Sequence, residues 1–359
     1  MPIRLLLTIF AALEIGAVAI GAMSAGSAKP AVSSEWTEAP SASASDMRSS
    51  SFDELRVRQE IRDRVEQSLI ARDYASIDAM ALEFRKSRAL TPSGVPKLYE
   101  LHAALEAQLG NPSPSSDCMI AGEQVYDEWE RSAPQSPTIY ITKAALLMKR
   151  AWCWRGSGYA SQVLEGAWPK FHANIAAAHA MLADHKAIAA QDPEYYVEME
   201  DVYQAEGRSR SEFQSLLKEA AAADPYYYPI YWQSYFYNQP QWFGSAKDVD
   251  AAGRFAAERT RAKDGSGAYA RYYWYASQVG CDCWSDAIDW PTMKASMHDV
   301  ATRYPDAWNL ANFARFGCMF NDRETARSYF DLLGEKDSAE AWKDEATRQK
   351  CRAFAGLNG

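Results

Sequence analysis

The stretch that decides the fold is Pro305-Asp306-Ala307-Trp308, because it nearly recurs as Ala339-Glu340-Ala341-Trp342, 34 positions later. A second pair behaves in the same way: Asp192-Pro193-Glu194-Tyr195-Tyr196 recurs as Asp224-Pro225-Tyr226-Tyr227-Tyr228, 32 positions later. A period of about 34 residues is typical of tetratricopeptide-type repeats, in which each unit is a helix, a turn and a second helix. The period therefore predicts an architecture, but it does not indicate a reaction.

The spacing of apolar residues between these motifs is also helical. Apolar residues recur at helical spacing at Leu55, Ile61, Val65, Leu69 and Ile70, Asp73-Tyr74 interrupts the pattern, and Ile77 resumes it. No alternating run with hairpin-turn residues demands a sheet. We therefore predict an all-α protein, a tetratricopeptide-like α-solenoid of stacked antiparallel helical hairpins. After the first hairpin, helices are expected at 94–109, 118–131, 137–154, 160–190, 193–207, 210–222, 227–238, 246–263, 267–280, 290–303, 306–319, 322–333 and 337–353.

The chain divides into three parts by composition. Residues 1–28 resemble a signal peptide, with Arg4 before an apolar stretch and small residues at Gly26-Ser27-Ala28. The apolar stretch is also just long enough for an uncleaved N-terminal membrane anchor, which stays the alternative. Residues 29–50 are rich in Ser, Ala and Pro and are predicted to be a disordered linker. Residues 51–355 form the predicted helical-repeat domain.

The charge of the chain limits its partners. The protein has 359 residues, of which 48% are apolar, and a net charge of -9 with a pI near 5.2. An acidic surface argues against nucleic acid, which needs a basic face. It also argues against electrostatic attachment to a membrane, so membrane contact is expected only if the N-terminal segment is uncleaved.

Six cysteines suit an exported protein, because disulfides persist in oxidising compartments. Cys118 is expected to open one helix and Cys153 to close the next. The turn between these helices is predicted near 133–137, midway between the two cysteines. Antiparallel packing would then bring the two sulfurs side by side, which predicts a disulfide.

Cys318 and Cys351 are symmetrical about Gly334-Glu335 in the same way, which predicts a second disulfide. The remaining Cys281-Asp282-Cys283 is open to two interpretations. It is either a redox pair or half of a metal site, or it serves structural bridges or stays reduced. The chain offers no second Cys or His pair as further ligands, which favours the structural interpretation and predicts no metal site.

Several aromatic strings resemble a known family. Trp152-Cys-Trp-Arg-Gly-Ser-Gly-Tyr-Ala160, Gln241-Trp-Phe-Gly-Ser245, Tyr269-Ala-Arg-Tyr-Tyr-Trp274 and Trp308-Asn-Leu-Ala-Asn-Phe-Ala-Arg-Phe316 follow one another along the chain. Together they resemble the bacterial domain-of-unknown-function family 4034, over roughly residues 69–342. The resemblance implies a helical, repeat-like domain, but it implies no activity.

One polar face near the C-terminal end is a candidate binding surface. Asn309, Asn312 and Arg315 lie at three-residue steps, which places them on one face of a helix. In tetratricopeptide domains that face often lines a concave groove, where Asn amides hold a peptide backbone. The alternative is a solvated polar face.

The segment Arg155-Gly156-Ser157-Gly158-Tyr159 is a candidate anion site. Its glycines free backbone N–H groups to converge, while Ser157 adds a donor and Arg155 adds a charge. The alternative is a helix C-cap followed by a turn and a new N-cap. The alternative is favoured, because no Lys follows at phosphate-loop spacing.

Aromatic residues are unusually dense at 226–243 and 269–275. Tyr231, Trp232, Tyr272 and Trp274 are the candidates for ligand contact in these segments. Tyr and Trp combine an apolar ring with a polar tip, which suits sugar stacking or peptide contact. Packing between repeats is the alternative explanation and accounts for most of these rings.

These features give two hypotheses. The first is an exported, non-catalytic helical-repeat scaffold that binds a protein or peptide partner in the periplasm or cell envelope. The second is a periplasmic enzyme or carbohydrate-binding module that uses the aromatic segments. Known catalytic and cofactor motifs are missing, and the histidines are spaced unsuitably for a helical metal pair, so no cofactor is predicted.

Overall fold

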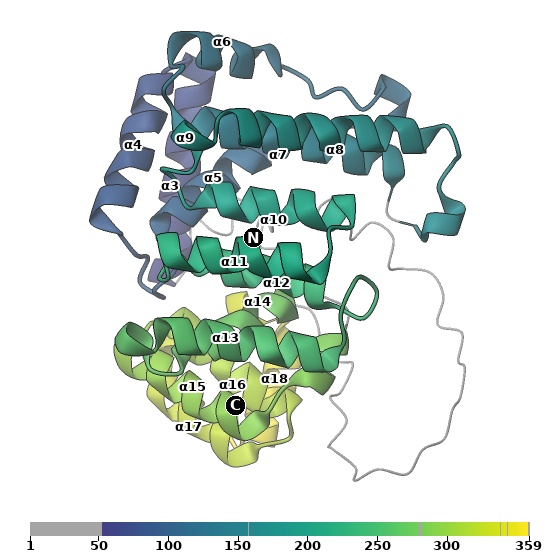
Figure 1. Cartoon of the computed structure of the whole chain (residues 1–359). Helices are drawn as coiled ribbons and strands as arrows, with labels where there is room; N and C mark the ends of the chain where they lie inside the picture. The colour runs from purple at the N-terminus through teal and green to yellow at the C-terminus, as the bar shows by residue number, and fades with distance from the viewer. Residues whose placement is uncertain (1–51, 157, 280–281, 338, 343, 358–359) are drawn as a thin grey trace.

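A computed structural model of the chain describes residues 52–357 except 157, 280–281, 338 and 343, and it leaves the side chains of 282 and 283 undescribed. The predicted signal peptide and linker therefore lie outside the described residues. The α-helices, numbered as in Figure 1, are α3 (Asp53–Ala71), α4 (Tyr74–Ser87), α5 (Lys97–Gln108), α6 (Gln124–Ser132), α7 (Pro137–Arg155), α8 (Ala167–Asp184), α9 (Lys186–Ala189), α10 (Glu194–Glu206), α11 (Arg210–Ala223), α12 (Pro229–Asn238), α13 (Ala246–Asp264), α14 (Gly267–Val279), α15 (Trp290–Arg303), α16 (Ala307–Met319), α17 (Arg323–Leu333) and α18 (Glu345–Phe354).

The described residues contain no β-strand, only an isolated bridge between Leu90 and Pro96. The prediction of an all-α protein built from packed helical hairpins is confirmed. Figure 1 shows the group α3–α9 above and the group α13–α18 below, with α10–α12 between them.

The repeated Asp-Pro motif builds the same turn twice. The Asp192 carboxylate accepts a hydrogen bond from the backbone N–H of Glu194 at 3.0 Å, and Asp224 accepts one from Tyr226 at 3.1 Å. Asp side chains favour such turns because they bond their own backbone two residues on. The first turn leads into α10 and the second into α12, so the motif marks equivalent helix starts.

The other repeated motif is equivalent only in part. Ala307-Trp308 begins α16, whereas Ala339–Ala341 is the 3-10 helix η7 and is followed by Trp342. Asp344 caps the last helix by accepting from the backbone N–H of Thr347 at 2.6 Å, so α18 begins only at Glu345. The predicted helix 337–353 is therefore too long at its start.

Two other predicted helices are shorter in the structure. The expected helix 160–190 is divided into α8 and α9, which meet at His185. The expected helix 118–131 begins only at Gln124, because Asp117 and Cys118 adopt positive φ values of 51° and 54° that a helix does not allow.

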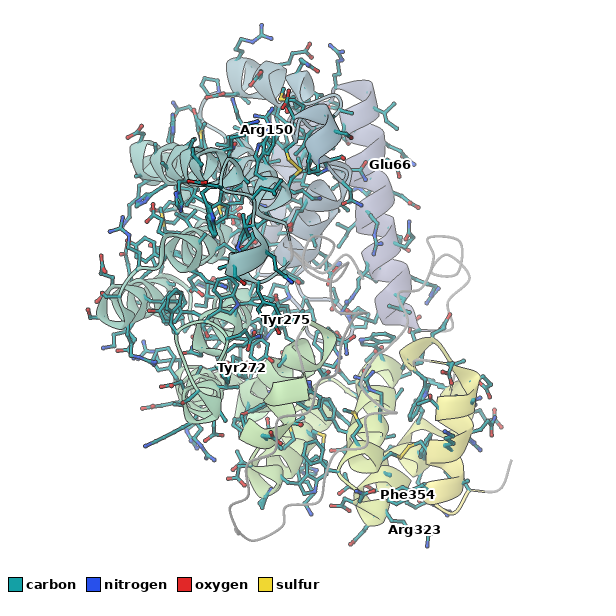
Figure 2. The ribbon with its side chains drawn as sticks, turned by 90° about the vertical axis from the view of Figure 1, so that its right-hand side faces the viewer. Glu66, Arg150, Tyr272, Tyr275, Arg323 and Phe354 are labelled. Atoms are coloured by element: carbon teal, nitrogen blue, oxygen red, sulfur yellow. A yellow bond between two sulfur atoms is a disulfide. The ribbon has the colours of Figure 1, made fainter. Side chains whose placement is uncertain are left out.

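An inner row of helices runs through the molecule. Helices α5, α7, α10, α12 and α14 pack on one another in that order, while later helices of each hairpin cover them. The first helix, α3, packs on α5 at the start of this row. It also packs on α16, which belongs to the C-terminal group of helices. Figure 2 shows α3, the helix that carries Glu66, running down one side of the molecule toward the C-terminal helices.

Two hydrophobic cores meet on the shared helices. Ile61 of α3 and Tyr231 of α12 belong to the first core, whereas Leu55 of α3 and Trp232 of α12 belong to the second. Neighbouring residues of one helix thus face different cores. The two halves of the array are therefore joined through buried side chains of α3 and α12.

Candidate functional site

The junction between α3 and the inner row holds a buried ionic cluster. The Arg58 guanidinium contacts the Glu54 carboxylate at 2.5 Å and the Glu100 carboxylate at 3.3 Å. Burial alone would lower the pKa of Arg58, but the charges of Glu100 and Glu54 raise it. Glu54 also accepts a hydrogen bond from the backbone N–H of Ser93 at 2.8 Å. The cluster thus pairs one guanidinium with two carboxylates, and burial raises the pKa of Glu100 above its ordinary value although the charge of Arg58 lowers it.

The loop around Ser93 ties the first hairpin to the C-terminal helices. Its carbonyl accepts hydrogen bonds from Arg271 Nη2 at 2.8 Å and from Asn309 Nδ2 at 3.0 Å. Gly94 follows with φ +85°, and a Cβ there would lie 2.4 Å from Arg271 Nη2 and 2.9 Å from the Tyr304 ring. Only glycine fits this approach. Asn309 is therefore a structural tie, and the prediction that it lines an open groove is wrong.

Asn312 and Arg315 lie in the interior as well. The Asn312 amide donates to the Trp308 carbonyl of its own helix at 2.8 Å, and its Oδ1 has no hydrogen-bond partner. Arg315 Nη2 donates to Ser277 Oγ at 3.3 Å, while Nε and Nη1 have no partner. Burial lowers the pKa of Arg315 to about 10. The expected open surface at these two residues is wrong, because both are about 1% exposed.

The candidate anion site has a different role in its described part. Arg155 Nη1 donates to the carbonyls of Gly156 at 3.0 Å and Gly158 at 3.1 Å. Its guanidinium lies against the rings of Trp152 and Trp242, 5.3 and 6.0 Å from their centres. The loop thus presents carbonyl oxygens to Arg155, as expected for the helix end that Gly156 caps with φ 68°. Ser157 lies outside the described residues.

Trp232 lies at the centre of the aromatic segments. Tyr99 lies 5.3 Å from it and Trp274 lies 6.3 Å from it, both edge to face, and Tyr275 stacks on it at 5.6 Å. Figure 2 places Tyr275 near the middle of the molecule. Trp274 is only half-buried, and Arg58 lies 5.9 Å from its ring. These rings join α5, α12 and α14, which supports the packing interpretation for Trp232.

The other two aromatic candidates are also buried. Tyr231 donates its hydroxyl to the Pro225 carbonyl at 3.0 Å. Tyr272 packs edge to face on Tyr235 at 6.0 Å and is fully buried. Burial raises the pKa of Tyr272 well above its ordinary value. Neither ring presents a surface on which a sugar can stack.

Both predicted disulfides are present. Cys118 pairs with Cys153 across a Cα–Cα distance of 5.8 Å, and Cys318 pairs with Cys351 across 5.7 Å. The first joins the turn before α6 to the end of α7, and the second joins α16 to α18. In Cys281-Asp282-Cys283, the first cysteine and the side chain of the last lie outside the described residues.

The sequence analysis missed a buried acidic helix. In α10 the side chains of Glu194, Glu198, Glu200 and Asp201 are all at most 5% exposed. Asp201 accepts a hydrogen bond from Gln233, whereas both oxygens of Glu200 lack a partner. Burial, and then the charge of Asp201, raises the pKa of Glu200 well above its ordinary value. The helix carries five carboxylates in 13 residues, but such a composition does not indicate burial, because Asp and Glu are rarely buried.

A cleft of about 240 Å³ lies where the two Asp-Pro turns approach α4. Arg85 contacts Asp192 at 3.0 Å, and Arg88 contacts Asp224 at 3.5 Å. Lys263 also lines the cleft, although the chain as a whole is acidic. The two arginines are compensated by the Asp side chains that shape the turns, so these charges have a structural explanation.

The fold and its buried polar groups define a helical-repeat protein whose inner helices enclose charged side chains. Comparisons with protein-family models, with curated proteins and with solved structures give no match for this chain. The resemblance to family 4034 therefore stays a prediction.

The described part of the chain also bears on membrane and metal binding. No helix in it combines the length and apolar character that crossing a membrane requires. In the same residues, no group of three or more His, Cys, Asp or Glu side chains is placed to hold a metal ion. The site is thus characterised by its ionic and amide groups.

Proposed function

We propose that the protein is an exported, non-catalytic helical-repeat scaffold of the cell envelope that binds a protein or peptide partner. Membership of family 4034 is part of the same proposal. The architecture supports the binding role, because stacked hairpins present a continuous inner surface made from successive helices. The two disulfides support export, since such bridges persist in oxidising compartments.

The observation that carries the proposal is the row of inner helices. Helices α5, α7, α10, α12 and α14 pack on one another in that order. In helical-repeat proteins, successive helices of this kind create an extended concave surface on which partners bind.

Photo-crosslinking in cells tests the proposal. A photoreactive amino acid replaces Gln278, a half-buried residue of α14 that hydrogen-bonds to Ser277 beside Arg315. The matched control carries it at Leu332 of α17, which is 65% exposed. We expect one discrete adduct from position 278 that is missing from position 332, identified by mass spectrometry. Identical adducts from both positions, or none from position 278, would contradict the proposal.

The alternative function is a periplasmic enzyme or a carbohydrate-binding module. The buried carboxylates of α10 favour the enzyme, since perturbed carboxyl groups often perform acid–base chemistry. Glu200 has such a raised pKa, and Asp201 lies next to it. Release of reducing ends from envelope glycans by the wild type, but not by the Glu200→Gln variant, would support this alternative over the scaffold.

A further inference from the structure

The cleft beside α4 lies where the two groups of helices meet. Its lining comes from the end of α4, the segment 89–98, both Asp-Pro turns and the end of α13. Figure 1 shows α4 in the upper group of helices and α13 in the lower group. The cleft measures about 240 Å³, whereas a cavity of about 150 Å³ is enough to take up benzene. It therefore has room for a small molecule that contains a ring.

The two Asp-Pro turns at this cleft use their carboxylates differently. Asp192 is fully buried and contacts both Arg85, at 3.0 Å, and His102, at 3.1 Å. The side chain of Asp224 is 20% exposed and contacts Arg88 at 3.5 Å. Arg88 is itself 58% exposed, and an exposed ion pair contributes little to stability. The first turn is therefore closed, whereas the second leaves its charges accessible from the cleft.

Lys263 brings a second cation to the open turn. Its ammonium lies 5.0 Å from the centre of the Tyr226 ring, and no carboxylate of the described residues forms an ion pair with it. The backbone N–H of Tyr226 donates to the Asp224 carboxylate at 3.1 Å, so Lys263 and Arg88 contact the same turn. Two accessible cations thus lie close together in an acidic protein.

The charges that line the cleft leave one positive charge without a partner. Arg85 is paired with the buried Asp192. Of the other charged residues that line the cleft in the described structure, Arg88 and Lys263 are positive and Asp224 is negative. A carboxylate, with its single negative charge, matches this balance better than a phosphate group, which carries about two. Its oxygens also accept charge-assisted hydrogen bonds from a guanidinium and an ammonium group.

The rest of the cleft is largely apolar. Phe84 and Leu98 are at most 5% exposed, and Leu90 and the Tyr226 ring are half-buried. Apolar and aromatic walls with a few polar groups are typical of sites for small molecules. A ligand that fills this cleft therefore needs an apolar body next to its anion.

We propose that the cleft binds a small organic carboxylate with an apolar ring. The carboxylate bonds to the Lys263 ammonium and the Arg88 guanidinium, and the ring lies against Leu90 and Tyr226. This site goes beyond the scaffold function, because its ligand is a small molecule and not a protein.

Three small probes test the two parts of this ligand. Benzoate carries the carboxylate and the ring, benzamide has the same shape without the charge, and acetate has the carboxylate without the ring. Titrations followed by the NMR signals of each probe measure binding to the purified protein. We expect benzoate to bind with a Kd of about 1 mM or below. Benzamide and acetate should each bind at least about 10-fold more weakly, because each lacks one of the two interactions.

Variants with matched controls place the binding in the cleft. Lys263→Met and Arg88→Met should each weaken benzoate binding about 10-fold, because each removes one charge-assisted hydrogen bond. Arg261→Met on α13 and Lys86→Met on α4 change exposed cations that do not line the cleft, and they should bind as the wild type does. Melting curves recorded beside each titration confirm that the variants are folded.

Asp224→Asn should change binding in the opposite direction. Asn can accept the same backbone N–H and so retains the turn, while the negative charge next to Arg88 is removed. We expect benzoate to bind about 3-fold more tightly, a gain that a merely structural role of Asp224 would not produce.

Three results would overturn the assignment. Benzamide binding as tightly as benzoate would show that the charge is not recognised. Acetate or inorganic phosphate binding as tightly as benzoate would show that the ring is not recognised. Wild-type affinity in both Lys263→Met and Arg88→Met would place the binding outside the cleft. None of these results affects the scaffold proposal, because the cross-linking test uses α14, which does not line the cleft.

Discussion

Arg58 of α3 and Arg315 of α16 are two arginines with nearly the same burial and opposite surroundings. Their exposed fractions are 3% and 1%. Arg58 contacts the carboxylates of Glu54 and Glu100, and the pKa of Arg58 is raised. Arg315 contacts one hydroxyl, and burial lowers the pKa of Arg315 to about 10. Burial alone therefore does not decide the electrostatic state of a charge; the partners do.

A third arginine shows that a carboxylate is not the only solution. Arg271 donates to the Ser93 carbonyl and lies between the rings of Tyr228 and Tyr304, 5.2 and 5.0 Å from their centres. Cation–π contacts of this kind compensate a buried guanidinium without a formal charge. Arg58 and Arg271 both hold the first hairpin in place. Among the described residues Arg315 donates only to the Ser277 hydroxyl of α14, without a carboxylate or a ring beside it, which separates it from Arg58 and Arg271.

The largest effect that this comparison predicts is at Arg58. Arg58→Met leaves Glu54 and Glu100 buried without their cation, so the free energy of unfolding should fall by about 3–5 kcal/mol. Urea unfolding followed by circular dichroism measures the change. Arg56→Met is the control, because Arg56 is 53% exposed and its pair with Asp53 contributes less than about 1 kcal/mol. Equal losses from both variants would show that the buried cluster is not what stabilises α3.

Arg315→Met should change stability in the opposite direction. The variant replaces an uncompensated buried charge by an apolar side chain of similar length. Such replacements are known to be neutral or stabilising, so we expect a gain of about 1–3 kcal/mol in the same urea experiment. A substantial loss would show that Arg315 has a structural role like that of Arg58, and the comparison between the two would fail.

The sequence predicted the parts of this molecule that depend on local patterns. The 34-residue period and the helical spacing predicted the stacked hairpins, and the symmetry about each turn predicted both disulfides. Cys118 and Cys153 meet because two antiparallel helices return the chain to the same place. These features follow from residues near one another in sequence.

The roles of the polar residues depended on contacts that no local pattern contains. Asn309 was expected on an open groove, but it bonds to Ser93, 216 positions away. That contact requires α3 to pack on both α5 and α16. It also requires Gly94, where a side chain would collide with Arg271 and Tyr304. The acidic residues of α10 were missed for a similar reason. Charges at several positions of a helix usually indicate a solvated helix, whereas α10 is covered by packing against α7, α8, α11 and α12.

The smallest effect that the comparison predicts is at Glu200. This residue is a buried acid whose two carboxyl oxygens have no hydrogen-bond partner. A buried carboxyl group avoids the free-energy cost of burying a charge by keeping its proton, which leaves it neutral. A guanidinium cannot become neutral in this way at ordinary pH. The pKa of Glu200 is raised well above its ordinary value of 4.5 in the folded state, so the unfolded chain releases this proton first. The free energy of unfolding should therefore decrease as the pH rises above 4.5, by about 1.4 kcal/mol per pH unit until the folded-state pKa is reached.

Glu200→Gln retains the shape of the side chain and removes this titration. Relative to the wild type, the variant should become progressively more stable as the pH rises above 4.5, with a slope of up to about 1.4 kcal/mol per unit in urea unfolding until the folded-state pKa of Glu200 is reached. The control Glu66→Gln changes an exposed residue of α3 and should run parallel to the wild type. If Glu200→Gln also runs parallel, Glu200 is ionised in the folded protein. The distinction between an acid that sheds its charge and an arginine that cannot would then be lost.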